Sequence, residues 1–124
     1  MKFFVCEICG NMVEMLQESG VSMVCCGQNM TELIPGTSDG AQEKRVPVIR
    51  TDGREVIVEI GSVEHPMTEA HHIEWITIET TQGSHRRRLE ITDRPRARFL
   101  LDEGEEVIAA YEYCNLHGLW KAEK

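Results

Sequence analysis

The chain has 124 residues, of which 41% are hydrophobic and 27% charged, and its net charge is −8. This length and composition are typical of one globular domain, or one domain plus a small module, and they exclude a fully disordered chain. The excess of acidic residues disfavours nucleic acid as a partner. The apolar runs are too short to predict a membrane-spanning helix or a signal peptide. We therefore expect a cytoplasmic protein.

The first 36 residues differ from the rest of the chain, because they hold four of the five cysteines. So short a segment cannot bury enough apolar surface to fold around a core of its own, and something else must hold it together. A Pro- and Gly-containing stretch, residues 35–40, has the composition of a linker. We therefore expect two domains, residues 1–36 and 37–124.

The four cysteines of this segment follow a metal-binding pattern. Cys6 and Cys9 are separated by two residues, and the adjacent pair Cys25 and Cys26 precedes Gly27. Clustered cysteines in a reducing compartment indicate metal ligands, and four thiolates suit zinc or a single iron. Neighbouring side chains of an extended segment point apart, so both sulfurs reach one ion only if the backbone twists, which Gly27 eases. The alternatives are two disulfides or free buried thiols, and spacing alone does not choose between iron and zinc.

The remainder of the chain shows short alternating or β-branched runs instead of a helical period. Turn signals separate these runs at about ten-residue intervals, a pattern typical of an antiparallel sandwich or barrel. The predicted strands are residues 55–60, 73–79, 87–91, 97–101 and 107–113.

A second group of candidate ligands lies in the loops beside these strands. His65 and His71 lie in a segment that leads into a strand, and Cys114 and His117 follow the last predicted strand. Either pair alone is a weak signal. Together they offer three nitrogens and one sulfur, a donor set that suits iron or zinc.

Several long motifs in order make the chain resemble the desulfoferrodoxins, the two-iron superoxide reductases. These motifs are the four-cysteine pattern ending in Gly27, then Glu43-Lys44 before Val46-Pro47-Val48, Gly61-Ser62-Val63, His65-Pro66-Met67 with His71, Ile73-Glu74-Trp75-Ile76, and Glu112-Tyr113-Cys114-Asn115-Leu116-His117-Gly118 with Trp120-Lys121. The resemblance implies an all-β protein, with a small desulforedoxin-like module followed by an immunoglobulin-like antiparallel β-sandwich. It also implies a homodimer.

The resemblance further implies the chemistry of the two centres. The four cysteines would hold a rubredoxin-type iron, and a second iron would be held by four histidine nitrogens and an axial cysteine, with one position open for superoxide. Superoxide would take one electron and two protons to give hydrogen peroxide, with electrons from a rubredoxin-like donor. Lys44 would supply positive charge near the substrate, and Glu43 would occupy the open position in the ferric state.

One residue departs from the family pattern. Arg45 stands where the family has a histidine directly after the Glu-Lys pair. A guanidinium stays protonated and has no lone pair to offer a metal, so we expect Arg45 to turn away from it. His72 and His85 are poor substitutes, because both need geometry that the pattern does not supply. We expect the second site to keep His65, His71, Cys114 and His117 and to lose one ligand, with zinc as an alternative metal.

Three functions are compatible with this sequence. The first is a superoxide reductase, which the retained Glu43 and Lys44 favour. The second is an electron-transfer protein whose second site is impaired, which Arg45 favours. The third is a structural metalloprotein with zinc in both sites.

Overall fold

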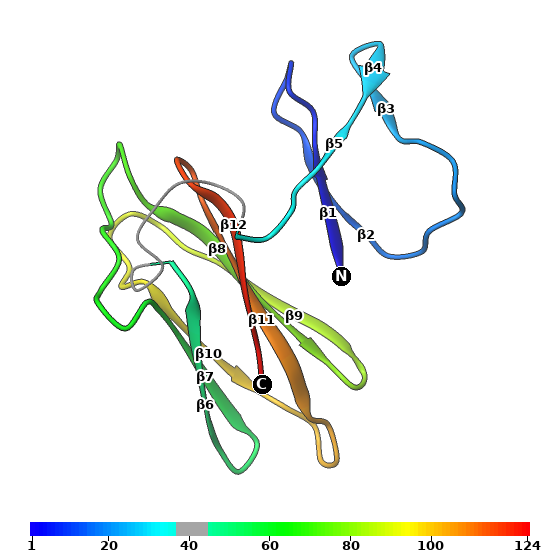
Figure 1. Cartoon of the computed structure of the whole chain (residues 1–124). Coiled ribbons are helices and arrows are strands. Elements are labelled where there is room, and N and C mark those ends of the chain that lie inside the picture. The colour runs from blue at the N-terminus through cyan, green and yellow to red at the C-terminus, as the bar shows by residue number, and fades with distance from the viewer. Residues whose placement is uncertain (37–44) are drawn as a thin grey trace. The chain divides into compact units, whose positions relative to one another are not determined.

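The computed structural model describes residues 1–36 and 45–124, and these residues form β-strands and no α-helix (Figure 1). They divide into two compact units, Met1–Ile34 and Pro35–Lys124. No helix in the described ranges has the length and apolar character needed to cross a bilayer. The all-β prediction is therefore confirmed.

The first unit consists of short strands. They are β1 (Lys2–Val5), β2 (Met12–Met15), β3 (Val24–Cys25), β4 (Gln28–Asn29) and β5 (Thr31–Glu32). Antiparallel pairing gives a sheet in the order β2-β1-β5 and a separate β3-β4 hairpin. Within this unit Phe3 and Cys6 are the buried apolar residues. So small a core cannot by itself offset the entropy of ordering the segment.

The second unit is a sandwich of two antiparallel sheets. Its strands are β6 (Pro47–Asp52), β7 (Glu55–Ile60), β8 (Ile73–Thr80), β9 (Gly83–Arg88), β10 (Arg96–Leu100), β11 (Val107–Cys114) and β12 (Gly118–Glu123). One sheet has the order β10-β7-β6 and the other β12-β11-β8-β9. Strand β6 lies beside β11 and β12, so the sheets meet on that side and β9 and β10 are edge strands on the other.

The core of the sandwich consists of apolar side chains at alternate positions along the strands. On β7, Val56, Val58 and Ile60 are almost completely buried, and they pack with Ile76 and Ile78 from β8 of the other sheet. Full burial of one such side chain is worth about 1.5–3 kcal/mol. The period-2 pattern that predicted these strands is therefore the pattern that forms the core.

Strand β9 corrects one prediction, since it spans residues 83–88 and not 87–91. Thr80 of β8 pairs with Gly83, which leaves two residues in the turn. This pairing makes Gly83 the first residue of β9. Tight hairpin geometry thus overrides the low strand propensity of Gly83 and Ser84. Strands β6 and β12 were not predicted from the sequence.

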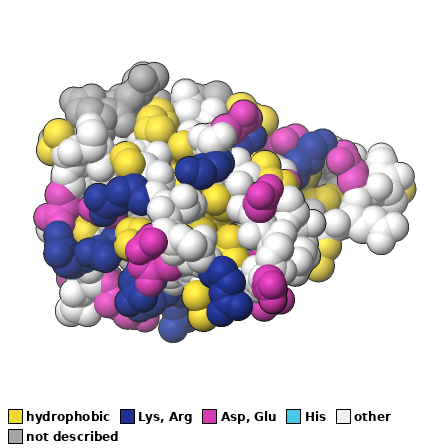
Figure 2. Space-filling view, turned by 90° about the horizontal axis from the view of Figure 1, so that it is seen from below, with side chains coloured by type: hydrophobic (Ala, Val, Ile, Leu, Met, Phe, Trp, Pro, Cys, Tyr) yellow, Lys and Arg dark blue, Asp and Glu magenta, His cyan; other side chains and the backbone are white. Residues whose placement is uncertain are grey.

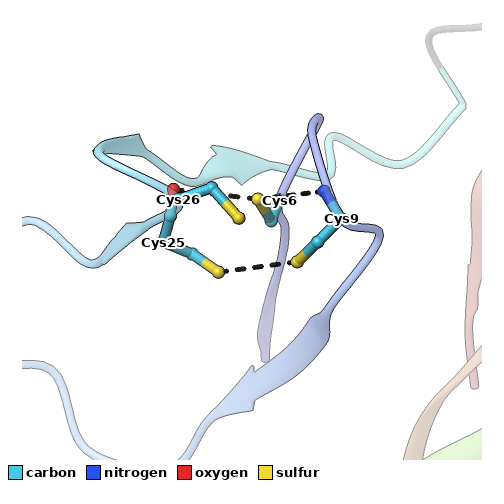
Figure 3. A group of neighbouring side chains, drawn as sticks. All are labelled: Cys6, Cys9, Cys25 and Cys26. Atoms are coloured by element: carbon cyan, nitrogen blue, oxygen red, sulfur yellow. Dashed lines mark hydrogen bonds between the residues drawn. The ribbon is translucent and has the colours of Figure 1, made fainter.

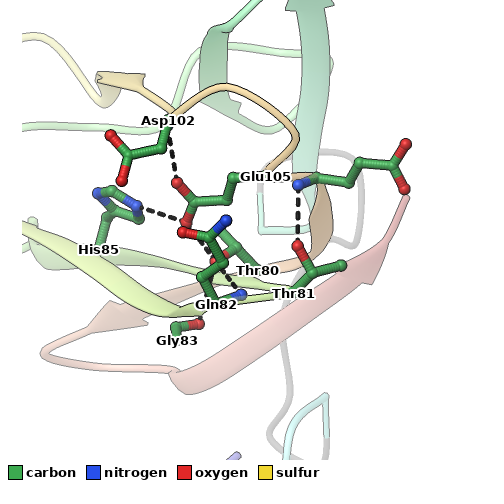
Figure 4. Close-up of polar contacts among 8 residues, drawn as sticks. Thr80, Thr81, Gln82, Gly83, His85, Asp102 and Glu105 are labelled. Carbon is green, nitrogen blue, oxygen red and sulfur yellow. Dashed lines mark hydrogen bonds and ion pairs between the residues drawn. The ribbon is translucent and has the colours of Figure 1, made fainter.

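A buried carboxylate ties the β8-β9 hairpin to the loop before β11 (Figure 4). Glu105 accepts hydrogen bonds from the Thr80 hydroxyl, from Nε2 of His85 (3.0 Å) and from the backbone N–H of Asp102 (2.9 Å). These donors lower the pKa of Glu105 to about 2, with the Thr80 hydroxyl contributing most. The carboxylate therefore stays ionised across the physiological pH range.

Candidate metal centres

The four cysteines of the first unit lie around one point (Figure 3). All four sulfurs lie within 4.8 Å of one another, and Sγ of Cys9 is 3.6 Å from Sγ of Cys25. That separation is far longer than an S–S bond, and all five cysteines of the chain are free. Disulfide pairing, one of the alternatives from the sequence, is therefore not adopted.

Backbone geometry brings the adjacent pair to one point. Cys26 has φ +53° and Gly27 φ +77°, so two successive residues occupy the left-handed region. A non-glycine residue in this region is strained, and such strain occurs where the surrounding structure needs it. The expected twist of the backbone is found, and Cys26 itself bears part of it.

The environment of the sulfurs suits a cation. The backbone N–H of Cys9 lies 3.5 Å from Sγ of Cys6, and such N–H donors lower the pKa of Cys6 to about 6. The neighbouring thiols, Cys9 foremost, raise the pKa of Cys26 to about 12. The four groups cannot all ionise together while no positive charge lies among them. A bound metal ion supplies that charge, so the donor set fits a four-cysteine metal centre.

The second cluster lies at one end of the sandwich. The ligand atoms of His65, His71 and Cys114 lie within 4.8 Å of one another. The rings of His65 and His71 meet edge to face with centroids 4.7 Å apart, and the rings of His71 and His117 do so at 5.2 Å. The structure thus brings the ligand atoms of His65, His71 and Cys114 together, and it places the ring of His117 against His71.

The orientation of His65 is fixed by its other ring nitrogen. Nδ1 lies 2.7 Å from the carbonyl oxygen of Pro66, which requires the proton on Nδ1 and leaves the lone pair on Nε2. His65 is 2% exposed, and burial is the main cause that lowers its pKa to about 4. Its buried Nε2 has no hydrogen-bond partner within residues 1–36 and 45–124. A neutral imidazole with a buried, unused lone pair fits a metal ligand.

Cys114 is the last residue of β11 and is fully buried. Burial raises the pKa of its thiol, and hydrogen bonds from the backbone amides of Leu116 and His117 oppose that rise. Amide donors aimed at a sulfur stabilise the thiolate form, which is the form that binds a metal.

Asn115 holds the two ligand-bearing loops together, a role that the sequence did not predict. Its Oδ1 accepts a hydrogen bond from the backbone N–H of His72 (2.8 Å), and its Nδ2 donates to the carbonyl of Ala70 (3.0 Å). The loop that carries His65 and His71 is thereby tied to the loop that carries Cys114. The sequence offered two signals, its position between Cys114 and His117 and its membership of the motif that contains both.

Arg45, which we expect to turn away from the metal, is buried, with only 5% of its surface exposed. Burial is the main cause of the pKa shifts of His65, Cys114 and Glu112, and the Arg45 charge acts on all three, adding to the lowered pKa of His65 and opposing the raised pKa of the other two. Arg45 therefore lies near the His/Cys cluster. Glu112 is fully buried two residues before Cys114, and burial raises its pKa to about 9. Neither carboxylate oxygen of Glu112 has a hydrogen-bond partner within the described part of the chain. The position at which a fourth imidazole was expected therefore places a buried cation beside the site.

The other candidate residues lie outside the cluster. Nδ1 of His72 hydrogen-bonds to the carbonyl of Thr68 (2.9 Å), and His85 of β9 is bound to Glu105. Neither supplies a fourth imidazole. Glu43 and Lys44 lie outside the described residues.

Fold and donor sets together define a class: an all-β protein with one cysteine-only metal centre and a separate histidine–cysteine centre. The family model for desulfoferrodoxin matches residues 37–123, and that for the N-terminal domain of desulfoferrodoxin matches residues 1–33. The chain belongs to the desulfoferrodoxin family. Its four-cysteine and His/Cys sites are accordingly consistent with two iron centres.

Similar proteins span the whole chain. A desulfoferrodoxin of Nitratidesulfovibrio vulgaris is 47% identical over 98% of this chain and 95% of its own length. A desulfoferrodoxin homolog of Archaeoglobus fulgidus is 42% identical, covering 98% of this chain and 96% of the relative. The crystal structure of the superoxide reductase from Treponema pallidum matches with a TM-score of 0.83 and 36% identity over 98% of both chains. These likenesses associate the chain with superoxide reductases and point to an oxidoreductase.

Proposed function

We propose that this protein is a superoxide reductase, which converts superoxide, one electron and two protons into hydrogen peroxide. The observation that carries the proposal is the cluster of His65, His71, Cys114 and His117, in which imidazoles lie beside one buried thiol. Iron bound by this set would supply the single electron that superoxide needs.

The residues of the chain hold and tune this site. The hydrogen bond to Pro66 keeps His65 in the tautomer that presents Nε2. The amides of Leu116 and His117 stabilise the Cys114 thiolate. If iron is bound there, the Cys114 thiolate would donate electron density to it, and the amide hydrogen bonds to the sulfur would moderate that donation. The protein thus sets the reactivity of the centre through hydrogen bonds to the atoms that bind the metal.

Positive charge near the site suits an anionic substrate. The whole chain carries −8, which repels superoxide, so local cations must overcome that field. We propose Lys44 as one such cation and Glu43 as the group that occupies the open position in the ferric state, both by resemblance to the family. Arg45 adds a second positive charge beside the cluster.

Further features of the proposal concern the whole protein. We propose that residues 1–36 form an iron-binding module that relays or stores electrons, and that residues 37–124 form the reductase domain. A rubredoxin-like protein would donate the electrons. The protein would act in the cytoplasm as a homodimer.

One observation favours a second candidate function. Arg45 stands where the fourth imidazole was expected, and no other histidine of the described residues replaces it. A guanidinium near the metal disfavours cation binding by charge repulsion. The alternative is therefore an electron-transfer or structural metalloprotein whose second site is impaired or holds zinc.

Superoxide consumption by the anaerobically iron-loaded, pre-reduced protein distinguishes these functions. Under a calibrated superoxide flux, the reductase should consume superoxide in stoichiometric amounts and form peroxide without releasing dioxygen. Cys114→Ser should abolish this reaction, while Cys9→Ser, which damages only the four-cysteine centre, should leave the rate with pre-reduced protein within about twofold. Equal rates for the parent and Cys114→Ser, or dioxygen release, would contradict the proposal.

A further inference from the structure

A groove rich in arginine lies along the open side of the sandwich. It has a volume of about 220 Å³, and we call it the arginine groove; its lining is Arg87, Leu89, Asp93, Arg94, Arg96, Ala97 and Arg98. The groove lies between β9 and β10, the edge strands of the two sheets. Leu89 and Ala97, both nearly buried, give it an apolar base below the charged side chains.

The charge of this region opposes the charge of the rest of the protein. Residues 86–98 contain six of the thirteen basic residues of the chain and only two carboxylates, Glu90 and Asp93. The segment therefore carries +4, and the remaining residues together carry −12. Such a local field attracts anionic surfaces in spite of the net charge.

Several of these arginines have no partner of opposite charge in the described part of the chain. Arg94 pairs with Glu64 at 3.2 Å, and Arg98 pairs with Glu55, which partly neutralises them. Arg86, Arg87 and Arg96 make no ion pair with any residue in the ranges 1–36 and 45–124. Figure 2 shows one face of the molecule, on which Lys and Arg side chains lie among Asp and Glu side chains.

The arginine groove neighbours two further hollows, and one of these borders His65 of the His/Cys cluster. Arg94 also lines a hollow of about 180 Å³ beside Gly61 and Ser62, and a third hollow of about 580 Å³ whose wall includes His65, Pro66 and Met67. One side chain therefore borders all three hollows. A molecule seated over the arginines would therefore lie next to the hollow whose wall includes His65, a candidate iron ligand.

We propose that the arginine groove is the docking surface for an acidic electron-carrier protein that reduces the second iron. This inference rests on the proposed function and adds the partner's binding site and chemistry to it. In the reaction the carrier loses one electron, and ferric iron at the His/Cys site gains it. Arginines around a small apolar base match the composition of protein interfaces, where Arg is enriched and charge complementarity accelerates association. A nucleic acid fits less well, because its phosphates would extend beyond residues 86–98, and the rest of the chain carries −12.

A binding titration tests the proposal independently of catalysis. The probe is an oxidised rubredoxin with net negative charge, titrated calorimetrically into the iron-loaded, full-length protein at low and high ionic strength. Arg87→Ser/Arg96→Ser should weaken binding at least tenfold at low salt and reduce the salt dependence. Arg54→Ser, at an exposed arginine of the β6-β7 turn, should have little effect because it does not line the groove.

Kinetic measurements distinguish an error in the docking proposal from an error in the proposed superoxide reductase function. At an ionic strength that screens the long-range attraction of superoxide, the pre-reduced double variant should consume superoxide at the parent rate. At low ionic strength, electron transfer from reduced rubredoxin to the double variant should be at least tenfold slower than to the parent. Equal rubredoxin affinity and transfer rate in the parent and the double variant would overturn the docking proposal, whatever the superoxide rate. Tighter binding of a single-stranded oligonucleotide than of rubredoxin, lost in the double variant, would overturn it in favour of nucleic acid. Failure of the pre-reduced parent to consume superoxide would instead refute the proposed function.

Discussion

Arg45 stands where the resemblance to the family predicts a histidine. It lies buried beside His65 and Cys114, where its charge opposes the binding of a metal cation. We expect Arg45→Met, which keeps an unbranched but shorter side chain and removes the charge, to strengthen Fe²⁺ binding at the second site by about tenfold, or ~1.4 kcal/mol. Arg45→His should do at least as well, because it adds an imidazole. Iron retained per chain after dialysis against a graded chelator measures the effect.

The control for this prediction keeps the charge. Arg45→Lys should retain iron no better than the parent, since the cation remains. If Arg45→Met loses iron at the same chelator concentration as the parent, the charge of Arg45 does not govern metal binding. In that case its burial beside Glu112 would serve packing alone.

Glu105 should make the folded protein less stable as the pH falls into the acidic range. Its donors depress the pKa of the carboxyl from 4.5 to about 2 in the folded protein. A depressed carboxyl pKa contributes stability that is present above pH 4.5 and is lost as the pH falls from there towards 2. Glu105→Gln should therefore lower the thermal midpoint at pH 7, and the difference from the parent should shrink as the pH falls to about 3.

Glu103→Gln, at an exposed neighbour, should match the thermal midpoint of the parent at both pH values. An equal deficit for Glu105→Gln at neutral and acidic pH would show that its charge is not involved.

At the scale of elements, Asn115 couples the loop after β11 to the loop before β8. Its two side-chain hydrogen bonds join segments more than 40 residues apart in the sequence. Each is worth about 0.5–1.5 kcal/mol, so Asn115→Ala should destabilise the sandwich by about 1–3 kcal/mol. It should also accelerate loss of metal from the His/Cys site, because His71 and Cys114 are no longer held at a fixed separation.

A matched variant lies one residue away. Leu116 is 60% exposed in the same loop, so Leu116→Ala should leave both stability and metal release near the parent values. Denaturant unfolding and the rate of metal transfer to a chromophoric chelator measure the two effects. Unchanged metal release in Asn115→Ala would mean that the strands alone position the ligands.

Elements and ligands differed in how far the sequence could predict them. Strand β7 was predictable because alternation places Val56 and Val58 on one face, which is the face that the core buries. Strand β9 was misplaced because its register depends on pairing with β8, which no local pattern expresses. The same limit applied at the site. Histidine and cysteine positions were visible in the motifs, but the burial of Arg45 and the contacts of Asn115 arise only when distant loops meet.

At the scale of the whole molecule, the two units differ in what stabilises them. The second unit buries a continuous core from both sheets, whereas Phe3 and Cys6 are the buried apolar residues of the first. The first unit should therefore depend on its metal for folding, as small metal-binding domains do.

We expect Cys9→Ser, which removes one sulfur from the four-cysteine centre, to unfold residues 1–34 while the sandwich stays folded. Hydrogen exchange followed by mass spectrometry should show lost protection in β1 and β2 and parent-like protection in β7, β8 and β11. Ser19→Ala, an exposed change in the same unit, should preserve protection throughout. Persistent protection of β1 and β2 in Cys9→Ser would mean that the strands of the first unit fold without an intact four-cysteine centre, and would contradict the inference drawn from its small core.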